Sequence, residues 1–343
     1  MKKIFAVVAA VAVSSASLFA YNPPFGGEEL FRLTNPEMLS GSSSSSAAGG
    51  PAFNVIPASI TYNPALPAGS EILTFDVSGT LFANLDKEDG DKSAGGAFEI
   101  GVLYPTSWGT FTATFNSVIS ELYRMPLGKI HDFHAGAAKD INDWLAVGLN
   151  VYYRHYAAIG DGDSDFAVGA DLGAFAKVGD LGCFKDARLG ASVLNIGKPA
   201  DCPTMGLDRY EESSKYPSIF TPRVGFAATV VESGSWKAAV SADVSIPSFV
   251  NCISDVGVEL DYGEALKLNL AWQLNIREFA EGKDGICSCS LGVSYKFGIN
   301  SGKHSMTPSL ASQYLYGGLA AISGGARVDL GQKDTAGAEI QMW

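Results

Sequence analysis

Residues 265–274 read Ala-Leu-Lys-Leu-Asn-Leu-Ala-Trp-Gln-Leu, an almost unbroken alternation of apolar side chains with other types. Successive side chains of a β-strand point to opposite faces, so the leucines and Trp272 would share one face, with Lys267 and Asn269 on the other. Such a strand fits a soluble sandwich, with its apolar face buried, or a membrane barrel, with its apolar face against lipid. The rest of the chain decides between the two.

The first twenty residues have the pattern of a secretory signal peptide. A positively charged start, MKK, precedes an apolar run over residues 4–13, and the small Ala20 completes a cleavage site. The apolar run is too short to span a bilayer as a helix. We expect residues 1–20 to be removed on export and the mature chain to begin near Tyr21, outside the cytoplasm.

The composition is unusual for a soluble secreted protein. Charged residues make up only 17% of the chain and hydrophobic residues 47%, and there are 39 glycines. A soluble protein would carry more surface charge, whereas glycine suits crowded strand faces. The net charge of -12 argues against a nucleic-acid partner, because neutralising phosphates requires clustered Lys and Arg.

A two-residue period recurs along the chain from Ile72 onward. Strands are predicted over residues 72–85, 98–104, 111–115, 145–154, 166–172, 189–193, 224–230, 236–244, 256–262, 266–274 and 291–297. A shorter and weaker strand is predicted near residues 133–138, and residues 315–322 and 325–332 are candidates for two more. The pattern therefore gives about twelve strands, or about fourteen with the C-terminal pair.

The predicted connections alternate in length. Long ones over residues 86–93, 118–130, 157–164 and 196–218 are interleaved with short ones over residues 105–108, 140–143 and 232–235. Aromatic residues such as Tyr104, Trp236 and Tyr262 fall near strand ends, as in the interfacial girdles of membrane barrels. A Greek-key sandwich does not require long and short connections to alternate along the chain. We predict an all-β, transmembrane outer-membrane barrel of about 14 antiparallel strands over residues 71–343.

Residues 21–70 do not alternate and are predicted to form a separate N-terminal segment. A one-turn helix is expected after Asn35, with Asn35 as N-cap and Pro36 at the first helical position. Serine and glycine dominate residues 42–50, which predicts a flexible linker. A similar capped turn containing Asn63-Pro64-Ala65 directly precedes the first strand.

If the apolar strand faces contact lipid, the opposite faces line the barrel interior. The inward candidates that are aromatic or charged include Phe82, Glu99, Tyr152, Arg154, Asp171, Phe175 and Lys267. For any single residue, interior packing or ion pairing within a narrow barrel is the simpler interpretation. Taken together, inward aromatics with few charges beside them suit an amphipathic ligand such as a fatty acid.

No spacing typical of an enzyme or a metal site is present. His131 and His134 would point to opposite faces of one strand, and the five cysteines lack the spacing of a zinc site. The acidic residues 161–165 resemble the start of a calcium loop, but Phe166 stands where that loop needs glycine. We expect neither enzymatic activity nor a cofactor.

The layout resembles one known family. The non-alternating segment contains Tyr62-Asn63-Pro64-Ala65 and is followed by a strand, which is similar to the FadL/TodX long-chain fatty acid transporters and the related PorV-type barrels. More closely, it is similar to an uncharacterised FadL-like group of spirochaete outer-membrane proteins. The resemblance implies that Asn63, Pro64 and Ala65 lie in a hatch, residues 21–70, that plugs the barrel. It also implies that hydrophobic ligands enter from outside and leave sideways through a kinked strand.

The function implied by this resemblance is passive uptake of long-chain fatty acids or similar lipids through a plugged barrel in the outer membrane. Outer-membrane lipid and the barrel-assembly machinery are the further partners that it implies. The alternatives are a structural or surface-interaction barrel that binds a partner through residues 196–218, a small general porin, and a soluble β-protein.

Overall fold

The computed structural model describes residues 28, 30–42, 46–85, 94–122, 125–157, 164–201, 215–263, 265–280, 288–299, 303–315 and 318–332. The predicted signal peptide lies outside these residues. So do the acidic residues 161–163 and residues 202–214 of the long connection predicted over 196–218.

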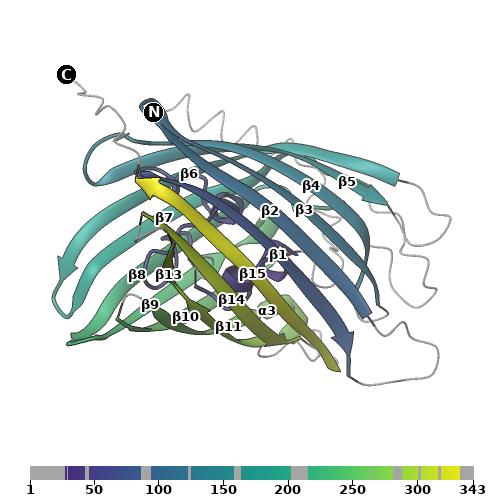
Figure 1. The fold of residues 1–343 in the computed structure, drawn as a ribbon. Helices are drawn as coiled ribbons and strands as arrows, with labels where there is room; N and C mark the ends of the chain where they lie inside the picture. Colours follow the sequence, from purple (N-terminus) through teal and green to yellow (C-terminus); the bar gives the residue numbers. More distant parts are fainter. Residues whose placement is uncertain are drawn as a thin grey trace.

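Within the described residues, the strands form one closed antiparallel sheet (Figure 1). They are β1 (Ile72–Asn84), β2 (Ala94–Thr106), β3 (Gly109–Leu122), β4 (Met125–Asp140), β5 (Leu145–Ala157), β6 (Ser164–Leu181), β7 (Phe184–Lys198), β8 (Thr221–Ser233), β9 (Trp236–Ser245), β10 (Ile253–Tyr262), β11 (Leu266–Asn275), β12 (Ser288–Tyr295), β13 (Phe297–Ile299), β14 (His304–Tyr314) and β15 (Leu319–Gln332). Because β12 and β13 both pair with β14 as one interrupted strand, the described sheet is a barrel of 14 strands. This confirms the predicted fold class.

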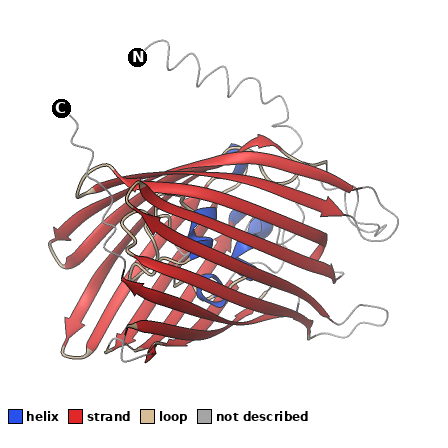
Figure 2. Ribbon diagram, turned by 45° about the horizontal axis from the view of Figure 1, so that its top comes forward, coloured by secondary structure: helices blue, strands red, loops and turns tan. Residues whose placement is uncertain are grey.

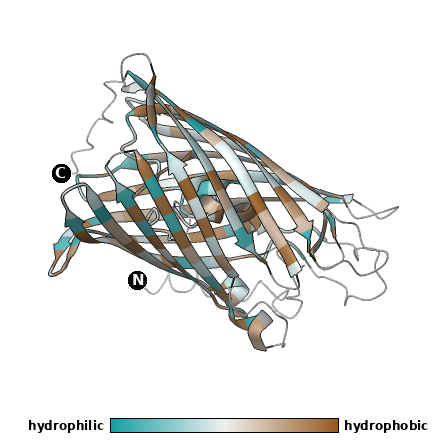
Figure 3. Cartoon of the chain, turned by 60° about the horizontal axis from the view of Figure 1, so that its bottom comes forward, coloured by the Kyte–Doolittle hydropathy of each residue, from teal (hydrophilic) through white to brown (hydrophobic). Residues whose placement is uncertain are grey.

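The apolar strand faces point outward. In β11, Leu268, Leu270 and Trp272 are 37–40% exposed, whereas Asn269 and Ala271 between them are buried. Figure 3 shows hydrophobic and hydrophilic segments alternating along the strands. An exposed apolar surface that encircles the molecule fits lipid rather than water.

The two ends of the barrel differ. The short-turn end has connections of two to four residues, at 107–108, 141–144, 182–183, 234–235 and 263–265. The long-loop end carries the connections at 85–93, 158–163, 199–220, 246–252 and 276–287, together with two short ones at 123–124 and 315–318. Strand β1 begins and β15 finishes at the short-turn end, and these two strands pair with each other to close the barrel.

Strand β4 is much longer than the predicted weak strand at residues 133–138. It pairs with β3 as far as Leu122 and Met125, so the long connection expected over residues 118–130 is mostly paired strand. A register shift beside Gly128, whose φ is 70°, displaces the alternation. Met125, Leu127 and Ile130 are consequently all buried, and the sequence period is lost there.

The C-terminal strand assignment was wrong. Strand β14 lies at His304–Tyr314, and residues 319–332 form the single strand β15 instead of two strands. The apolar face of β14 is interrupted by Pro308 and Ser312, which hides its period. Gly324 and Gly325 look like a turn in sequence, but both are paired within the sheet.

The N-terminal residues lie inside the barrel, where Figure 2 shows their short helices enclosed by strands. They include two 3-10 helices (Leu30–Leu33 and Pro57–Thr61) and the one-turn helix α2 (Pro36–Leu39). Asn35 caps α2 by accepting a hydrogen bond from the Glu37 amide at 2.9 Å, as the sequence predicted. We call residues 28–70 the inner segment.

Two further short helices, Pro247–Phe249 and α3 (Ile276–Ala280), lie in connections at the long-loop end. No helix among the described residues has the length and apolar character needed to cross a membrane.

Candidate functional site: the barrel interior

Inward-facing glycines let the inner segment approach the wall closely. Four of them form two cross-strand pairs on neighbouring strands, and we call them the glycine seat: Gly148 with Gly173, and Gly190 with Gly225. A Cβ atom at Gly148 would lie 2.0 Å from the carbonyl oxygen of Pro64. A Cβ atom at Gly190 would lie 2.0 Å from that of Ala47. No larger residue fits at these positions while the inner segment is in place.

The glycine seat also explains why residues 46–50, part of the predicted flexible linker, have a defined position. Ala47 and Ala48 are fully buried, and the amide of Ala47 donates to Asp243 of β9 at 2.6 Å. The expectation of a flexible linker was therefore wrong for residues 46–50. Composition gave no sign of the glycines on the distant strands that receive this turn.

Asn63 joins the inner segment to the wall. Its Nδ2 donates to the carbonyl oxygen of Ala47 at 2.8 Å and to that of Ala174 on β6 at 2.9 Å. Its Oδ1 accepts from the amide of Ala65 at 3.0 Å. Pro64 and Ala65 follow directly, with Pro64 against Gly148 and Ala65 fully buried. The motif thus occupies the glycine seat.

Buried ionic contacts fix the inner segment to other parts of the wall. Arg32 forms an ion pair with Asp255 of β10, and Glu37 lies 3.2 Å from Arg327 of β15. Thr34 donates to Glu99 of β2 at 3.0 Å. Removing one member of such a pair leaves a buried charge, which is strongly unfavourable. These contacts therefore define one position of the segment.

Arg154 is the centre of a second contact region. Its guanidinium lies 2.9 Å from Asp132 of β4 and within 4.8–5.4 Å of the ring centroids of Phe31, Tyr152 and Tyr216. Phe31 comes from the inner segment and Tyr216 from the connection between β7 and β8. Cation–π contacts of this kind are favourable when desolvated. Arg154 thus joins the wall, the inner segment and a long connection.

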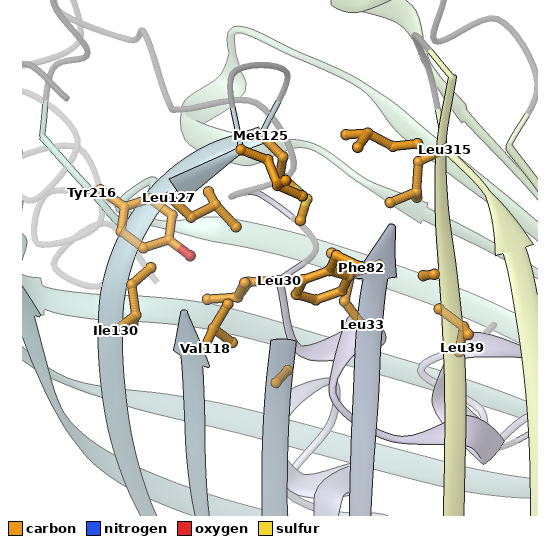
Figure 4. Packing of buried hydrophobic residues seen from close by; sticks show 14 of the residues in the cluster. Leu30, Leu33, Leu39, Phe82, Val118, Met125, Leu127, Ile130, Tyr216 and Leu315 are labelled. Carbon is orange, nitrogen blue, oxygen red and sulfur yellow. The ribbon is translucent and has the colours of Figure 1, made fainter. Parts of the chain in front are cut away.

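Above the inner segment, toward the long-loop end, the interior is apolar. We call this group the loop-end cluster (Figure 4), and its buried members include Leu30, Leu33, Phe82, Val118, Leu122, Met125, Leu127, Ile130, Tyr216 and Leu315. The inner segment contributes the three leucines at positions 30, 33 and 39, and the wall contributes most of the others. A buried apolar core therefore lies between the long-loop end and the inner segment.

A second group, the turn-end cluster, lies on the other side of the inner segment. Its buried members are Ala65, Leu66, Ala68, Ala138, Ala146 and Phe175, and Phe53 and Val55 pack against it. Phe53 stacks on Phe175 with their ring centroids 5.0 Å apart.

The predicted interior residues all lie on the inner side of the sheet. Tyr152, Arg154 and Asp171 are brought together on β5 and β6 around a cavity of about 40 Å³ that Arg154 and Asp171 line. Phe82 lies in the loop-end cluster and Phe175 in the turn-end cluster. Glu99 contacts the inner segment, and Lys267 pairs with Glu259 at 2.9 Å. The structure does not bring these seven residues into one site.

The wall residues that hold the inner segment were not singled out from the sequence. Arg32 and Asp255 are 223 residues apart, and no local pattern links partners at such separations. Among the described residues, Cys183 and Cys252 are free cysteines, and no group of three or more metal-ligating side chains occurs.

No family model and no curated protein matches this sequence. Among solved structures, a variant of TodX described as a monoaromatic hydrocarbon channel is 11% identical, with a TM-score of 0.53 over 84% of this chain and 98% of that chain. A Pseudomonas aeruginosa FadL homologue is 12% identical, with a TM-score of 0.50 over 86% and 97% of the two chains. The Pseudomonas putida toluene transporter TodX is 12% identical, with a TM-score of 0.50 over 84% and 97%. The chain therefore has the fold of TodX- and FadL-type outer-membrane barrels.

Proposed function

We propose that this protein is an outer-membrane channel for hydrophobic small molecules and that its inner segment acts as a hatch. The observation that carries the proposal is the apolar loop-end cluster, which ends on the inner segment in the middle of the barrel. A ligand that enters among these apolar residues meets residues 28–70 before it can reach the other end. The solved structures with this fold, described as a hydrocarbon channel and a toluene transporter, agree with such a role.

The way the inner segment is held also supports a hatch. Apart from its leucines, it is attached through side-chain pairs and through the glycine seat, and it adds no strand to the sheet. Its displacement would leave the hydrogen bonds between the barrel strands intact. A general porin would instead need a wide interior lined throughout by charge.

Long-chain fatty acids or similar lipids are the ligands that we infer. Their acyl chains fit an apolar lining, and the interior also offers cationic side chains next to aromatic rings, as at Arg154. Among the described strand pairs, β6 and β7 have the most register shifts. Two of these shifts, at Lys177/Gly179 and Gly179/Leu181, lie near the short-turn end, which makes this strand pair our candidate for a sideways exit.

Deletion of residues 21–50 tests the hatch. We expect the ion conductance of the purified protein in planar bilayers to increase, because the deletion removes material from the barrel interior. Unchanged conductance of a variant that still shows heat-modifiable gel migration would contradict the proposal.

A reversible tether covers the case in which the deletion variant does not fold. Ser78 of β1 donates to the carbonyl oxygen of Thr34 at 2.8 Å, so the two residues are adjacent. Formation of a disulfide in Thr34→Cys/Ser78→Cys is verified before uptake is measured. Uptake of labelled toluene by cells should fall in the oxidised double variant and recover on reduction. Ser78→Cys alone is the matched control, and equal uptake by oxidised and reduced protein would exclude a moving hatch.

A further inference from the structure

A separate cavity of about 260 Å³ lies at the short-turn end, between the inner segment and the wall. Its lining residues come from residues 52–53 and from strands β6 to β9, and they are Ala52, Phe53, Phe175, Lys177, Gly179, Asp186, Ala187, Arg188, Thr229 and Lys237. It lies on the opposite side of the inner segment from the loop-end cluster.

One side of this cavity is aromatic. Phe53 of the inner segment stacks on Phe175 of β6 at 5.0 Å, with the rings 16° from parallel. Both rings adjoin Leu66 and the other residues of the turn-end cluster. The cavity is therefore continuous with apolar packing on its inner side.

The other side is cationic. Lys177, Arg188 and Lys237 line the cavity, with Asp186 as the only acidic lining residue among the described residues. Neither lysine lies within 4.0 Å of a carboxylate oxygen in the described part of the chain, and Asp140 of β4 is the carboxylate that interacts with Lys177 over a longer range. This local excess of positive charge occurs in a chain with a net charge of -12, so it does not follow from average composition.

Arg188 is built into the cavity and is not a mobile surface residue. Only 6% of it is exposed, and its Nη2 donates to the carbonyl oxygens of Gly50 and Pro51. Its guanidinium also lies 5.1 Å from the Phe53 ring centroid. Its Nε is buried and finds no acceptor among the described residues, although buried donors are normally satisfied. The guanidinium that lines the cavity is thus held in a fixed position, and one of its donors lacks an acceptor.

We propose that this cavity binds the anionic headgroup of an acyl-chain amphiphile, a carboxylate or a phosphate, on the side of the hatch where ligand would be released. Arg188, Lys177 and Lys237 contact the headgroup, and the first methylene groups lie on the Phe53–Phe175 pair. Whole drug-sized ligands occupy pockets of about 300–1,000 Å³, so this cavity takes the headgroup and the start of the chain. The inference rests on the proposed function and narrows its substrate class to anionic amphiphiles.

The test measures binding of decanoate and of uncharged 1-decanol to the full-length protein in nanodiscs by isothermal titration calorimetry. In the double variant Lys177→Gln/Lys237→Gln we expect decanoate to bind at least about tenfold more weakly, which corresponds to a loss of about 1.4 kcal/mol of binding free energy. We expect the binding of 1-decanol to be unchanged. Lys185→Gln is the matched control, because Lys185 is an exposed β7 lysine outside the cavity that pairs with Glu232.

Equal decanoate affinity in wild type and in the double lysine variant would overturn the site, as would 1-decanol binding as tightly as decanoate. Dihexanoyl phosphatidic acid, used as a second probe, identifies the source of the headgroup. Tighter binding of this probe indicates a membrane phospholipid, and tighter binding of decanoate indicates a free fatty acid. Toluene uptake that still depends on the hatch, together with no charge-dependent decanoate binding, would refute this site and leave the proposed channel standing.

Discussion

At the scale of single residues, the glycine seat controls how the inner segment fits. Gly148 and its neighbours are glycines because backbone and side-chain atoms of the inner segment occupy the space where a Cβ atom would be. Their role is steric, since backbone conformation does not require glycine there: their φ angles are not in the left-handed region.

The substitution Gly148→Ala should displace the inner segment. The added Cβ atom would lie 2.0 Å from the Pro64 carbonyl oxygen, and overpacking of this kind costs about 1–3 kcal/mol. We expect a higher planar-bilayer conductance and a lower urea midpoint for folding into lipid vesicles. Gly79→Ala is the control, because the nearest atom to its Cβ would be 3.8 Å away. Identical behaviour of the two variants would show that the seat does not position the segment.

At the scale of elements, each strand has a lipid face and an interior face. Strand β11 shows the division most simply, since its leucines point outward and Asn269 points inward. The free energy of folding should therefore depend on which face and which depth a charge is placed at.

Leu270→Arg places a charge on the lipid face near the middle of β11. Such a change should destabilise folding into lipid vesicles by about 2–4 kcal/mol, whereas Tyr262→Arg at the end of the neighbouring strand β10 should cost about 0–1 kcal/mol. Equilibrium urea titrations in vesicles measure both values. Equal costs at the two positions would argue that β11 does not cross the bilayer with Leu270 at its centre.

A strand could be located from the sequence when its outward face carried an unbroken row of apolar side chains. Strands with uninterrupted apolar alternation, such as β1, β5 and β11, were located correctly. Strand β14 was missed because Pro308 and Ser312 occupy outward positions, and β4 was truncated because the shift beside Gly128 changes the phase. A period can be read only while each face keeps one kind of side chain.

At the scale of the whole molecule, the two ends should lie on opposite sides of the outer membrane. Cys183 is exposed at the short-turn end, and Lys215 is exposed in the connection between β7 and β8 at the long-loop end. Outer-membrane barrels place short turns in the periplasm and longer loops outside.

Labelling of intact cells with a membrane-impermeant maleimide tests this orientation. A variant whose only cysteine comes from Lys215→Cys should be labelled directly. A variant that keeps only Cys183 should be labelled after the outer membrane is permeabilised. The reverse order would invert the topology and, with it, the assignment of capture and release ends.

The interior was less predictable than the wall. The period of β5 and β6 placed Arg154 and Asp171 inside, but it could not show that Phe31 and Tyr216 would meet Arg154. The turn at Ala47 was expected to be flexible because the glycines that receive it lie more than a hundred residues further along the chain. Contacts across a barrel interior depend on closure of the whole sheet.

The placement of the inner segment has a consequence for assembly. Its residues are synthesised before every strand, yet Arg32 and Glu37 contact β10 and β15. The segment is enclosed on all sides once β1 pairs with β15. Arg32 and Glu37 reach their partners only after β10 and β15 have been added, so burial of residues 28–70 is completed late in assembly. Contacts of such long sequence separation form slowly, and a poorly fitting segment should first delay biogenesis, before any change in permeability of the finished barrel.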